Sequence, residues 1–268
     1  MTGSTVSRGL LRLATAAVLF FMYAPLALVI IYAFSATGSS AWPPASLSLK
    51  WLEIAAANTG LRDAFLTSIG VALGATVIAL ILGSLAALAV ARHRFFGREL
   101  VSFVVIFPIA LPGIVTGMAL STTFATTGLP LGFLAIIVGH ATFCIVLVYN
   151  NVLARLRRTS ASQEEASADL GADAFQTFRY ITLPAIRSAV LAGALLAFAL
   201  SFDEVIVTIF VAGGVKTLPI WIFQSFRLAN QVSLVNVAGL VAIVLSVVPV
   251  YLATRITADP AAVAGTRG

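Results

Sequence analysis

Long apolar segments separated by short polar ones dominate the chain. Six segments reach the length of about 20 helical residues that a hydrocarbon core of about 30 Å requires. They lie at about 12–36, 64–91, 100–122, 132–154, 186–211 and 232–255. Because lipid offers no hydrogen-bond partners to the backbone, each segment is expected to be a helix and not part of an open sheet. The pattern predicts an all-α integral membrane bundle of six transmembrane helices, formed as a single domain by residues 1–268.

Composition and charge agree with a membrane protein. The chain is 60% hydrophobic and only 10% charged, which is too apolar for the surface of a soluble protein. Its net charge of +6 does not indicate nucleic-acid binding, because the arginines lie at the ends of apolar segments and form no patch or stripe. The first segment follows Arg8 and Arg12, as in a signal peptide, but its apolar run is long enough to indicate an uncleaved first span.

The basic residues alternate between the two sides of the predicted bundle. Of the 16 lysines and arginines, those on one side are Arg8, Arg12, Arg92, Arg94, Arg98, Arg155, Arg157, Arg158, Arg179, Arg187, Arg255 and Arg267. The other side holds Lys50, Arg62, Lys216 and Arg227. Because cytoplasmic loops carry the excess of basic residues, this distribution predicts that both termini and the loop after the fourth span are cytoplasmic.

The longest polar stretch, "EEASADLGADAFQTFRYITLP", occupies residues 164–184 in that loop. Ser162 followed by Glu165 fits a capping box, which predicts a short helix from about residue 163 to 170. Gly171 suits the turn that ends this helix, and Asp173 with Gln176 predicts the cap of a second one. Pro184 is then expected in the first turn of the fifth span. A structured loop without a partner is the alternative to a docking segment.

This stretch resembles the EAA loop of the membrane subunits of bacterial ABC importers. The matching residues are Glu165-Ala166-Ser167, Gly171 and Ile181-Thr182-Leu183-Pro184, with Ser167 in place of the second alanine of the family pattern. In that family the loop is a coupling helix that docks into a groove of the ATPase subunit. The resemblance implies this role for Glu165, Ala166 and Gly171, and the expected docking loop also includes Glu164, Asp169, Phe175 and Pro184.

Two further stretches extend the resemblance. "FPIALPGIVTGMAL" is similar to the third-span signature of the family, and "SFDEVIVTIFVAGGVKTLPIWIF" resembles the segment after the loop in the spermidine/putrescine branch. Permeases for ferric iron, phosphonate and amino-acid derivatives share much of the pattern, so the cargo stays open at this point.

The resemblance implies a multi-subunit importer in the bacterial plasma membrane. Its other members would be two ATPase subunits, a homologous second permease and an extracytoplasmic substrate-binding protein. The chain has only two lysines, Lys50 and Lys216, and neither lies in a phosphate-binding Gly-x-x-x-x-Gly-Lys motif. We therefore expect no catalytic residue, metal or cofactor in this subunit, with ATP and Mg²⁺ bound by the ATPase partner and lipid around the spans.

Prolines and acids mark two irregular places within the spans. Pro108 and Pro112 are expected to break or kink the third span, either as a simple kink or as a bend lining a path through the bundle. Asp203 and Glu204 interrupt the fifth span roughly 25 Å along its helix, where ionised side chains should face protein or a water-filled cavity.

Two interpretations of the acids stay open. One is a structural pair, satisfied by neighbouring helices or by a sister subunit. The other is an acidic lining for a cationic substrate, in which Phe202 and Trp221 would add cation–π contacts to Asp203 and Glu204. His140 and Cys144 share a helix face, but two ligands are too few for zinc, so packing is favoured for His140.

Two other classes of membrane protein compete with the importer. A secondary transporter would need a coupling-ion site and usually internal repeats, and neither is evident in the sequence. A scaffold protein would explain six spans but not the spacing of the loop motif.

Overall fold

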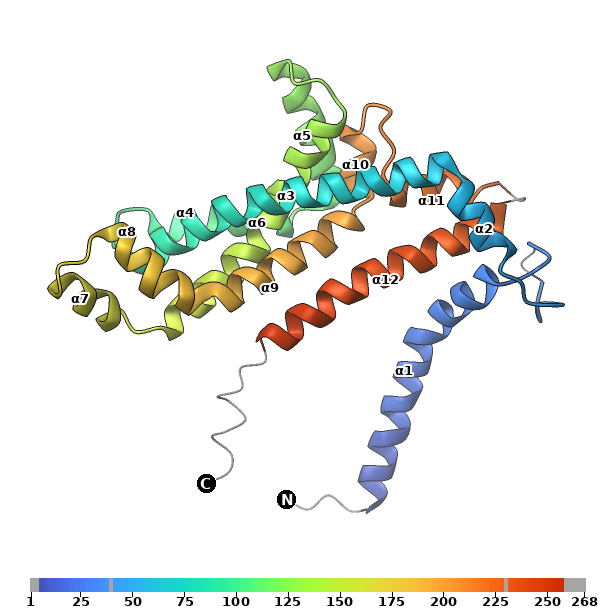
Figure 1. Ribbon diagram of the computed structural model, residues 1–268, viewed down its shortest axis with the longest axis horizontal. Coiled ribbons are helices and arrows are strands. Elements are labelled where there is room, and N and C mark those ends of the chain that lie inside the picture. Colours follow the sequence, from blue (N-terminus) through green and yellow to red (C-terminus); the bar gives the residue numbers. More distant parts are fainter. Residues whose placement is uncertain (1–4, 39–40, 229–230, 258–268) are drawn as a thin grey trace. The chain divides into compact units, whose positions relative to one another are not determined.

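The computed structural model describes residues 5–38, 41–228 and 231–257, and these residues form helices joined by short loops (Figure 1). Arg267, which contributes to the charge asymmetry, lies outside the described residues. The chain divides into two compact units, one formed by residues 1–62 and 221–243 and the other by residues 63–220 and 244–268. The loop and both irregular spans belong to the second unit.

The helices follow one another with short connections. In chain order they are α1 (Thr5–Ala33), α2 (Lys50–Ala57), α3 (Thr59–Arg92), α4 (Arg98–Ala110), α5 (Gly113–Thr127), α6 (Phe133–Arg158), α7 (Ser162–Asp169), α8 (Ala174–Thr177), the π-helical segment η1 (Phe178–Thr182), α9 (Leu183–Phe202), α10 (Ile206–Val211), α11 (Leu218–Ser225) and α12 (Val232–Thr257). Among the described residues the only β-type pairing is an isolated bridge between Ser35 and Leu47. The predicted all-α class is confirmed.

Five helical stretches are long and apolar enough to cross a membrane, and a bent helix pair supplies a sixth candidate. Four predicted spans correspond to the single helices α1, α3, α6 and α12. The third is not one helix, because α4 and α5 meet at a bend of 108°. Pro112, which has no N–H, is the N-cap residue of α5, and the N–H of Leu111 bonds back to the carbonyl of Pro108 at 3.3 Å.

The fifth span differs from its predicted bounds at both ends. Its helix runs without interruption from Ala174 to Phe202, through α8, η1 and α9, instead of from residue 186 to 211. It ends early because the acidic residues favour a turn. Asp203 is the C-cap residue of α9, and the Glu204 carboxylate accepts a hydrogen bond from the N–H of Val207 in α10 at 2.9 Å. Asp203 and Glu204 therefore lie in a break between two helices and not within one helix.

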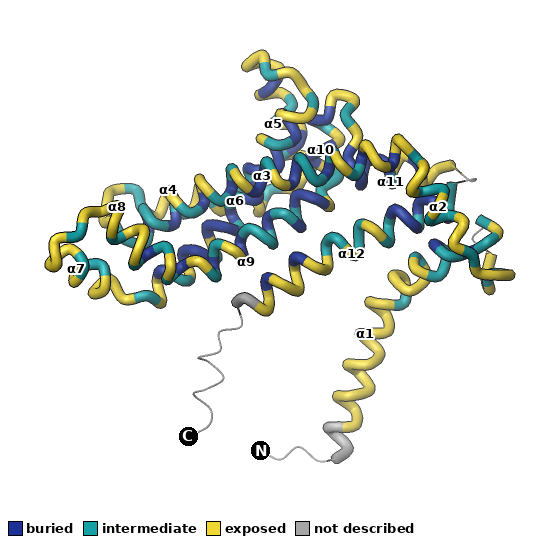
Figure 2. Tube along the Cα trace, viewed as in Figure 1, coloured by how far each residue is buried: buried dark blue, intermediate teal, exposed yellow. Residues whose placement is uncertain are grey.

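Helix α6 forms the centre of the second unit (Figure 2). Val148, which is fully buried, lies between two glycines on neighbouring helices. A Cβ atom on Gly83 of α3 would lie 3.0 Å from Cβ of Val148, and a Cβ atom on Gly193 of α9 would lie 3.1 Å from its Cα. Small residues allow such close backbone approach, and close packing is what holds helices together in lipid.

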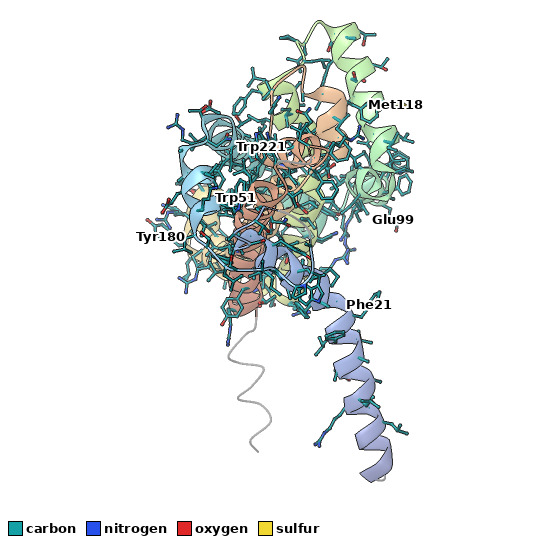
Figure 3. The ribbon with its side chains drawn as sticks, turned by 90° about the vertical axis from the view of Figure 1, so that its right-hand side faces the viewer. Phe21, Trp51, Glu99, Met118, Tyr180 and Trp221 are labelled. Carbon is teal, nitrogen blue, oxygen red and sulfur yellow. The ribbon has the colours of Figure 1, made fainter. Side chains whose placement is uncertain are left out.

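In the first unit, α1 presents apolar side chains outward along most of its length. Phe20 and Phe21 are 75% and 81% exposed, and Figure 3 shows Phe21 pointing away from the helix. Within that unit the indole of Trp51 packs over Gly38, and Val29 packs against Gly239 of α12. An exposed apolar helix of this length suits contact with lipid or with another membrane subunit.

The packing of α9 on α6 predicts that Gly193→Leu destabilises the protein by about 1–3 kcal/mol, the usual cost of overpacking a tight interface. Leucine is a good helix former, so the loss would report packing and not helix propensity. Thermal unfolding of the purified chain in detergent measures the effect. Gly9→Leu is the matched control, because a Cβ at Gly9 meets nothing within 4 Å. Equal unfolding temperatures for the two variants would contradict the packing account.

Candidate functional site

The polar loop consists of two short helices joined by a glycine turn. Helix α7 ends in a pair of hydrogen bonds typical of a Schellman turn. The N–H of Gly171 bonds to the carbonyl of Ala168 at 2.9 Å, and that of Ala172 bonds to Ser167 at 3.1 Å. Gly171 has a φ of +86°, which a residue with a Cβ atom adopts only with strain. The glycine turn thus sets the direction in which α7 points away from α8.

One of the two predicted caps is confirmed and the other is wrong. Asp173 caps α8, since its carboxylate accepts from the N–H of Gln176 at 2.8 Å while the Gln176 side chain accepts from the N–H of Asp173 at 3.0 Å. Ser162 is not an N-cap, because α7 already includes it and the N-cap residue is Ala161. The hydroxyl of Ser160 instead accepts from the N–H of Ser162 at 3.2 Å.

Pro184 lies in the first turn of α9, as predicted, but the helical stretch continues upstream of it through η1 and α8. The π-helical segment η1 immediately precedes α9 and makes this arrangement possible. In it the N–H of Leu183 bonds to the carbonyl of Phe178, five residues back. A wider turn next to a proline removes part of the conflict between its ring and the preceding turn. The loop therefore continues directly into the fifth span.

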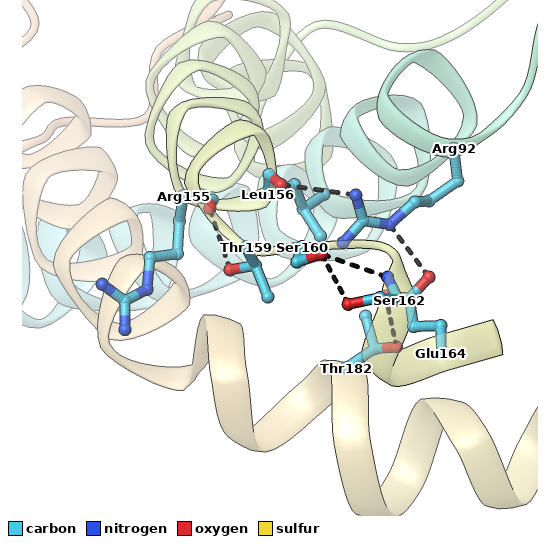
Figure 4. Close-up of polar contacts among 8 residues, drawn as sticks. All are labelled: Arg92, Arg155, Leu156, Thr159, Ser160, Ser162, Glu164 and Thr182. Atoms are coloured by element: carbon cyan, nitrogen blue, oxygen red, sulfur yellow. Dashed lines mark hydrogen bonds and ion pairs between the residues drawn. The ribbon is translucent and has the colours of Figure 1, made fainter. Parts of the chain in front are cut away.

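A half-buried arginine anchors the loop to the bundle (Figure 4). Arg92, at the end of α3, forms an ion pair through Nε with the Glu164 carboxylate at 2.9 Å and donates from Nη1 to the carbonyl of Leu156 at 3.3 Å. The second carboxylate oxygen of Glu164 accepts from the Thr182 hydroxyl at 3.0 Å. Glu164 thus joins α3, α7 and η1. From the sequence, Arg92 served only to assign the orientation of the bundle in the membrane. No feature near Arg92 or near Glu164 in the sequence indicates that the two residues form an ion pair.

The loop presents apolar and acidic side chains outward. Leu170, Phe175 and Tyr180 are 90%, 73% and 71% exposed, and Figure 3 shows Tyr180 pointing away from the helices. Glu165, Ala166 and Asp169 are also exposed. A hollow of about 570 Å³ lies between α7 and η1, lined by Gln163, Ala166, Ser167, Leu170, Ala172, Tyr180 and Ile181. Of the predicted loop residues, Glu164 is the one whose ion pair and hydrogen bond, among the described residues, hold the loop to the bundle.

The breaks in the third and fifth spans lie together in the second unit. Ile206 and Phe210 of α10 pack on Gly113 and Gly117 of α5, where a Cβ on Gly117 would lie 2.5 Å from the Phe210 ring. A cavity of about 210 Å³ opens beside them, lined by Pro108, Ile109, Leu111, Gly113, Thr116, Phe143, Leu200, Glu204 and Val207. The predicted break in the third span and the predicted acid Glu204 therefore adjoin the same cavity.

The other predicted pathway residues are dispersed. Asp203 is exposed, next to the cavity-lining Glu204 in sequence. Phe202 is buried and packs against Phe65 and Phe198, with ring centroids 6.4 and 6.0 Å apart, so its ring does not line an open path. Trp221 is buried in α11 and belongs to the first unit.

Comparison with known proteins identifies the class. A family model described as the binding-protein-dependent transport system inner membrane component matches residues 79–259. The chain belongs to this family, as a multi-pass protein of the inner membrane. It is thus a permease subunit of the ABC importer type, with the loop and the broken spans in the matched region.

Relatives place the chain within the branch that contains the polyamine permeases. The putrescine transport system permease protein PotI of Escherichia coli (strain K12) is 35% identical over 217 residues, which cover 78% of this chain and 76% of PotI. The spermidine/putrescine transport system permease protein PotC of Haemophilus influenzae is 33% identical over 255 residues, which cover 94% of this chain and 98% of PotC.

Solved structures share the fold. A bacterial ABC transporter involved in the import of the acidic polysaccharide alginate matches with a TM-score of 0.71 at 19% identity, covering 97% of this chain and all 100% of that one. The inward-facing MetNI methionine ABC transporter matches with a TM-score of 0.59 at 18% identity, covering 78% of this chain and 97% of that one.

The anchor formed by Arg92 and Glu164 predicts how firmly the loop is held. Glu164→Gln should raise the rate of tryptic cleavage at the exposed Arg157, Arg158 and Arg179 by roughly 5- to 30-fold, the effect of about 1–2 kcal/mol on local opening. Glu165→Gln is the control, because it removes a neighbouring exposed charge without touching the pair. The charge-swapped Arg92→Glu/Glu164→Arg variant should regain part of the protection. Equal cleavage of all these variants would refute the anchor.

Proposed function

We propose that the chain is one of two membrane subunits of an ATP-driven importer that carries polyamines or similar small organic cations. Its partners would be a homologous permease, two ATPase subunits and an extracytoplasmic binding protein. The loop of α7 and α8 and both chain termini would face the cytoplasm. The observation that carries the proposal is the loop itself, which is anchored to the bundle at Glu164 and exposes an apolar and acidic face.

The loop suits docking to another protein. Outside the hydrocarbon region, exposed side chains such as Leu170 and Phe175 would contact water unless a partner covers them. Glu165 and Asp169 flank these apolar residues, so the partner groove would combine an apolar floor with basic groups at its rim. An ATPase subunit that bound the loop in such a groove could move it, and the loop continues directly into the helix of the fifth span.

ATP would act through the partner and not through this chain. Neither lysine of the chain lies in a phosphate-binding motif, so ATP and Mg²⁺ would be held by the ATPase subunits, with no cofactor in the permease. Closure of the ATPase dimer would shift the docked loops and favour a state open toward the binding protein. Hydrolysis would release that state, so ATP biases a two-state equilibrium of the spans.

The acidic turn is the proposed contact for a cationic cargo. Asp203 is exposed, and Glu204 lines the cavity between the two broken spans. A polyamine carries ammonium groups separated by apolar spacers, which suits carboxylates beside apolar and aromatic surface such as Phe143 and Leu200. The names of the relatives PotI and PotC, which refer to putrescine and spermidine, favour this class of cargo over ferric iron or phosphonate.

The docking proposal predicts that Phe175→Ser weakens association with the ATPase subunit roughly 10- to 100-fold, because burying a phenylalanine side chain contributes about 1.5–3 kcal/mol. Retention of the ATPase subunit on the tagged, purified permease measures this directly. Phe96→Ser is the matched control, since Phe96 is fully exposed in the loop between α3 and α4, on the same side by the basic-residue pattern. Undiminished retention by the Phe175 variant would argue against docking at this face.

The cargo proposal predicts that Asp203→Asn lowers polyamine uptake by roughly 2- to 30-fold at matched expression. Asparagine keeps the shape of the side chain but removes its charge, and one carboxylate–ammonium contact in a wet cavity contributes about 0.5–2 kcal/mol. Glu204→Gln should change basal ATPase activity as well as uptake, because it removes a charge from the side chain that lines the cavity between the two broken spans.

Glu99→Gln controls for loss of an exposed carboxylate elsewhere in the same unit, at the start of α4. Normal uptake by Asp203→Asn would make Asp203 a structural residue. Failure of the wild-type complex to take up any polyamine would reject the cargo while leaving the family assignment intact.

A further inference from the structure

A buried histidine connects three helices around the acidic turn. His140 of α6 is fully buried, and both of its ring nitrogens have partners. Its Nδ1 lies 2.8 Å from the hydroxyl of Ser201, in the last turn of α9, and its Nε2 lies 2.8 Å from the hydroxyl of Thr208, in α10. Ser201 and Thr208 are themselves 2% and 0% exposed. One side chain therefore bridges the break that contains Asp203 and Glu204.

The hydrogen-bond pattern determines which ring nitrogen carries the proton. The Thr208 hydroxyl donates its single hydrogen to the carbonyl of Glu204 at 2.8 Å, so it can only accept from His140. The Nε2 atom is therefore the donor. In a neutral ring Nδ1 then accepts, and the Ser201 hydroxyl donates to it. In this arrangement both ring nitrogens have a partner and the Thr208 hydroxyl keeps its bond to the Glu204 carbonyl.

The same network extends to the side chain of Glu204. The Thr208 hydroxyl bonds to the Glu204 carbonyl, and the Glu204 carboxylate bonds to the N–H of Val207. These bonds occupy backbone groups that the break between α9 and α10 leaves without helical partners. The position of the Glu204 side chain at the cavity thus depends on contacts that lead back to α6.

We propose that His140 is a positioning residue that fixes α10 relative to α9 and thereby orients the acidic turn. The consequence for transport rests on the proposed function, in which that turn contacts the cargo. A purely apolar residue at position 140 would fill the same space, but it would leave Ser201 and Thr208 without a common partner in the interior. In a membrane protein, where buried polar groups are costly, satisfied polar groups at a helix break indicate a required geometry.

Cys144 provides a built-in comparison. It lies one turn further along α6, is equally buried, and its thiol contacts only the carbonyl of Ala197 in α9, at 3.4 Å. Cys144 therefore joins α6 to α9 without crossing the break. A variant at Cys144 perturbs the same helix interface without removing any of the hydrogen bonds that join His140, Ser201, Thr208 and Glu204.

The functional test uses the complete complex in proteoliposomes and measures polyamine uptake per ATP hydrolysed. Thr208→Val, which replaces the hydroxyl by a methyl group of the same shape, should lower this ratio at least about fivefold. Thr208→Ser keeps the hydroxyl and should restore it, and Cys144→Ala should match the wild type. An unchanged ratio in Thr208→Val, or an equal loss in Cys144→Ala, would overturn the positioning role.

A second measurement requires no cargo. The chain has two histidines, so His93→Gln leaves His140 as the only one in this subunit. When this chain alone is labelled with ¹⁵N-histidine and assembled with unlabelled partner subunits, the spectrum reports the ring nitrogens of His140 alone. We expect the signals of a neutral ring protonated at Nε2. In Thr208→Val we expect these signals to disappear or to be replaced by those of a ring protonated at Nδ1. A ring protonated at Nδ1 while Thr208 is intact, or one insensitive to Thr208→Val, would contradict the inference. If the wild type takes up no polyamine, the proposed cargo fails, whereas the nitrogen spectrum still decides the role of His140.

Discussion

The absence of hydrogen-bond partners in lipid is the constraint on which this structure depends. A transmembrane helix satisfies its own backbone, but a broken one frees N–H and carbonyl groups that protein or enclosed water must satisfy. The third and fifth spans are both broken, at Leu111–Pro112 and at residues 203–205. The two breaks adjoin one cavity, and α5 and α10 pack through glycines beside it. The carboxylate of Glu204 and the hydroxyl of Thr208 bond to backbone groups that the second break exposes.

A single helical stretch connects this region to the loop. From Ala174 to Phe202 the chain is helical for 29 residues, or about 43 Å at 1.5 Å per residue. One end carries the exposed residues of the loop and is held by Glu164 and Arg92, and the other end leads into the acidic turn held by His140. A displacement of the loop is therefore applied to the same continuous helical stretch that leads to Asp203 and Glu204. The fold provides a direct mechanical connection between the proposed ATPase contact and the proposed cargo contact.

Sequence reasoning recovered the features that depend on local chemistry. The four spans that form the single helices α1, α3, α6 and α12, the left-handed turn at Gly171 and the cap at Asp173 each follow from neighbouring residues. It missed two local outcomes, because the Ser162 cap did not form and the fifth span ended at Phe202, before the acidic turn. It also failed where distant residues decide the outcome. Arg92 with Glu164, and His140 with Ser201 and Thr208, are pairs that only the packing of several helices brings together.

We propose that this chain forms half of a transport path that is driven by ATP bound to a separate subunit. The most direct test is accumulation of radiolabelled putrescine or spermidine in proteoliposomes that contain the complete complex. The account predicts accumulation only with ATP on the side of the α7–α8 loop, loaded binding protein on the opposite side, and the ATPase subunits present. Accumulation by this chain without ATPase subunits, driven by an ion gradient, would contradict it and indicate a secondary transporter.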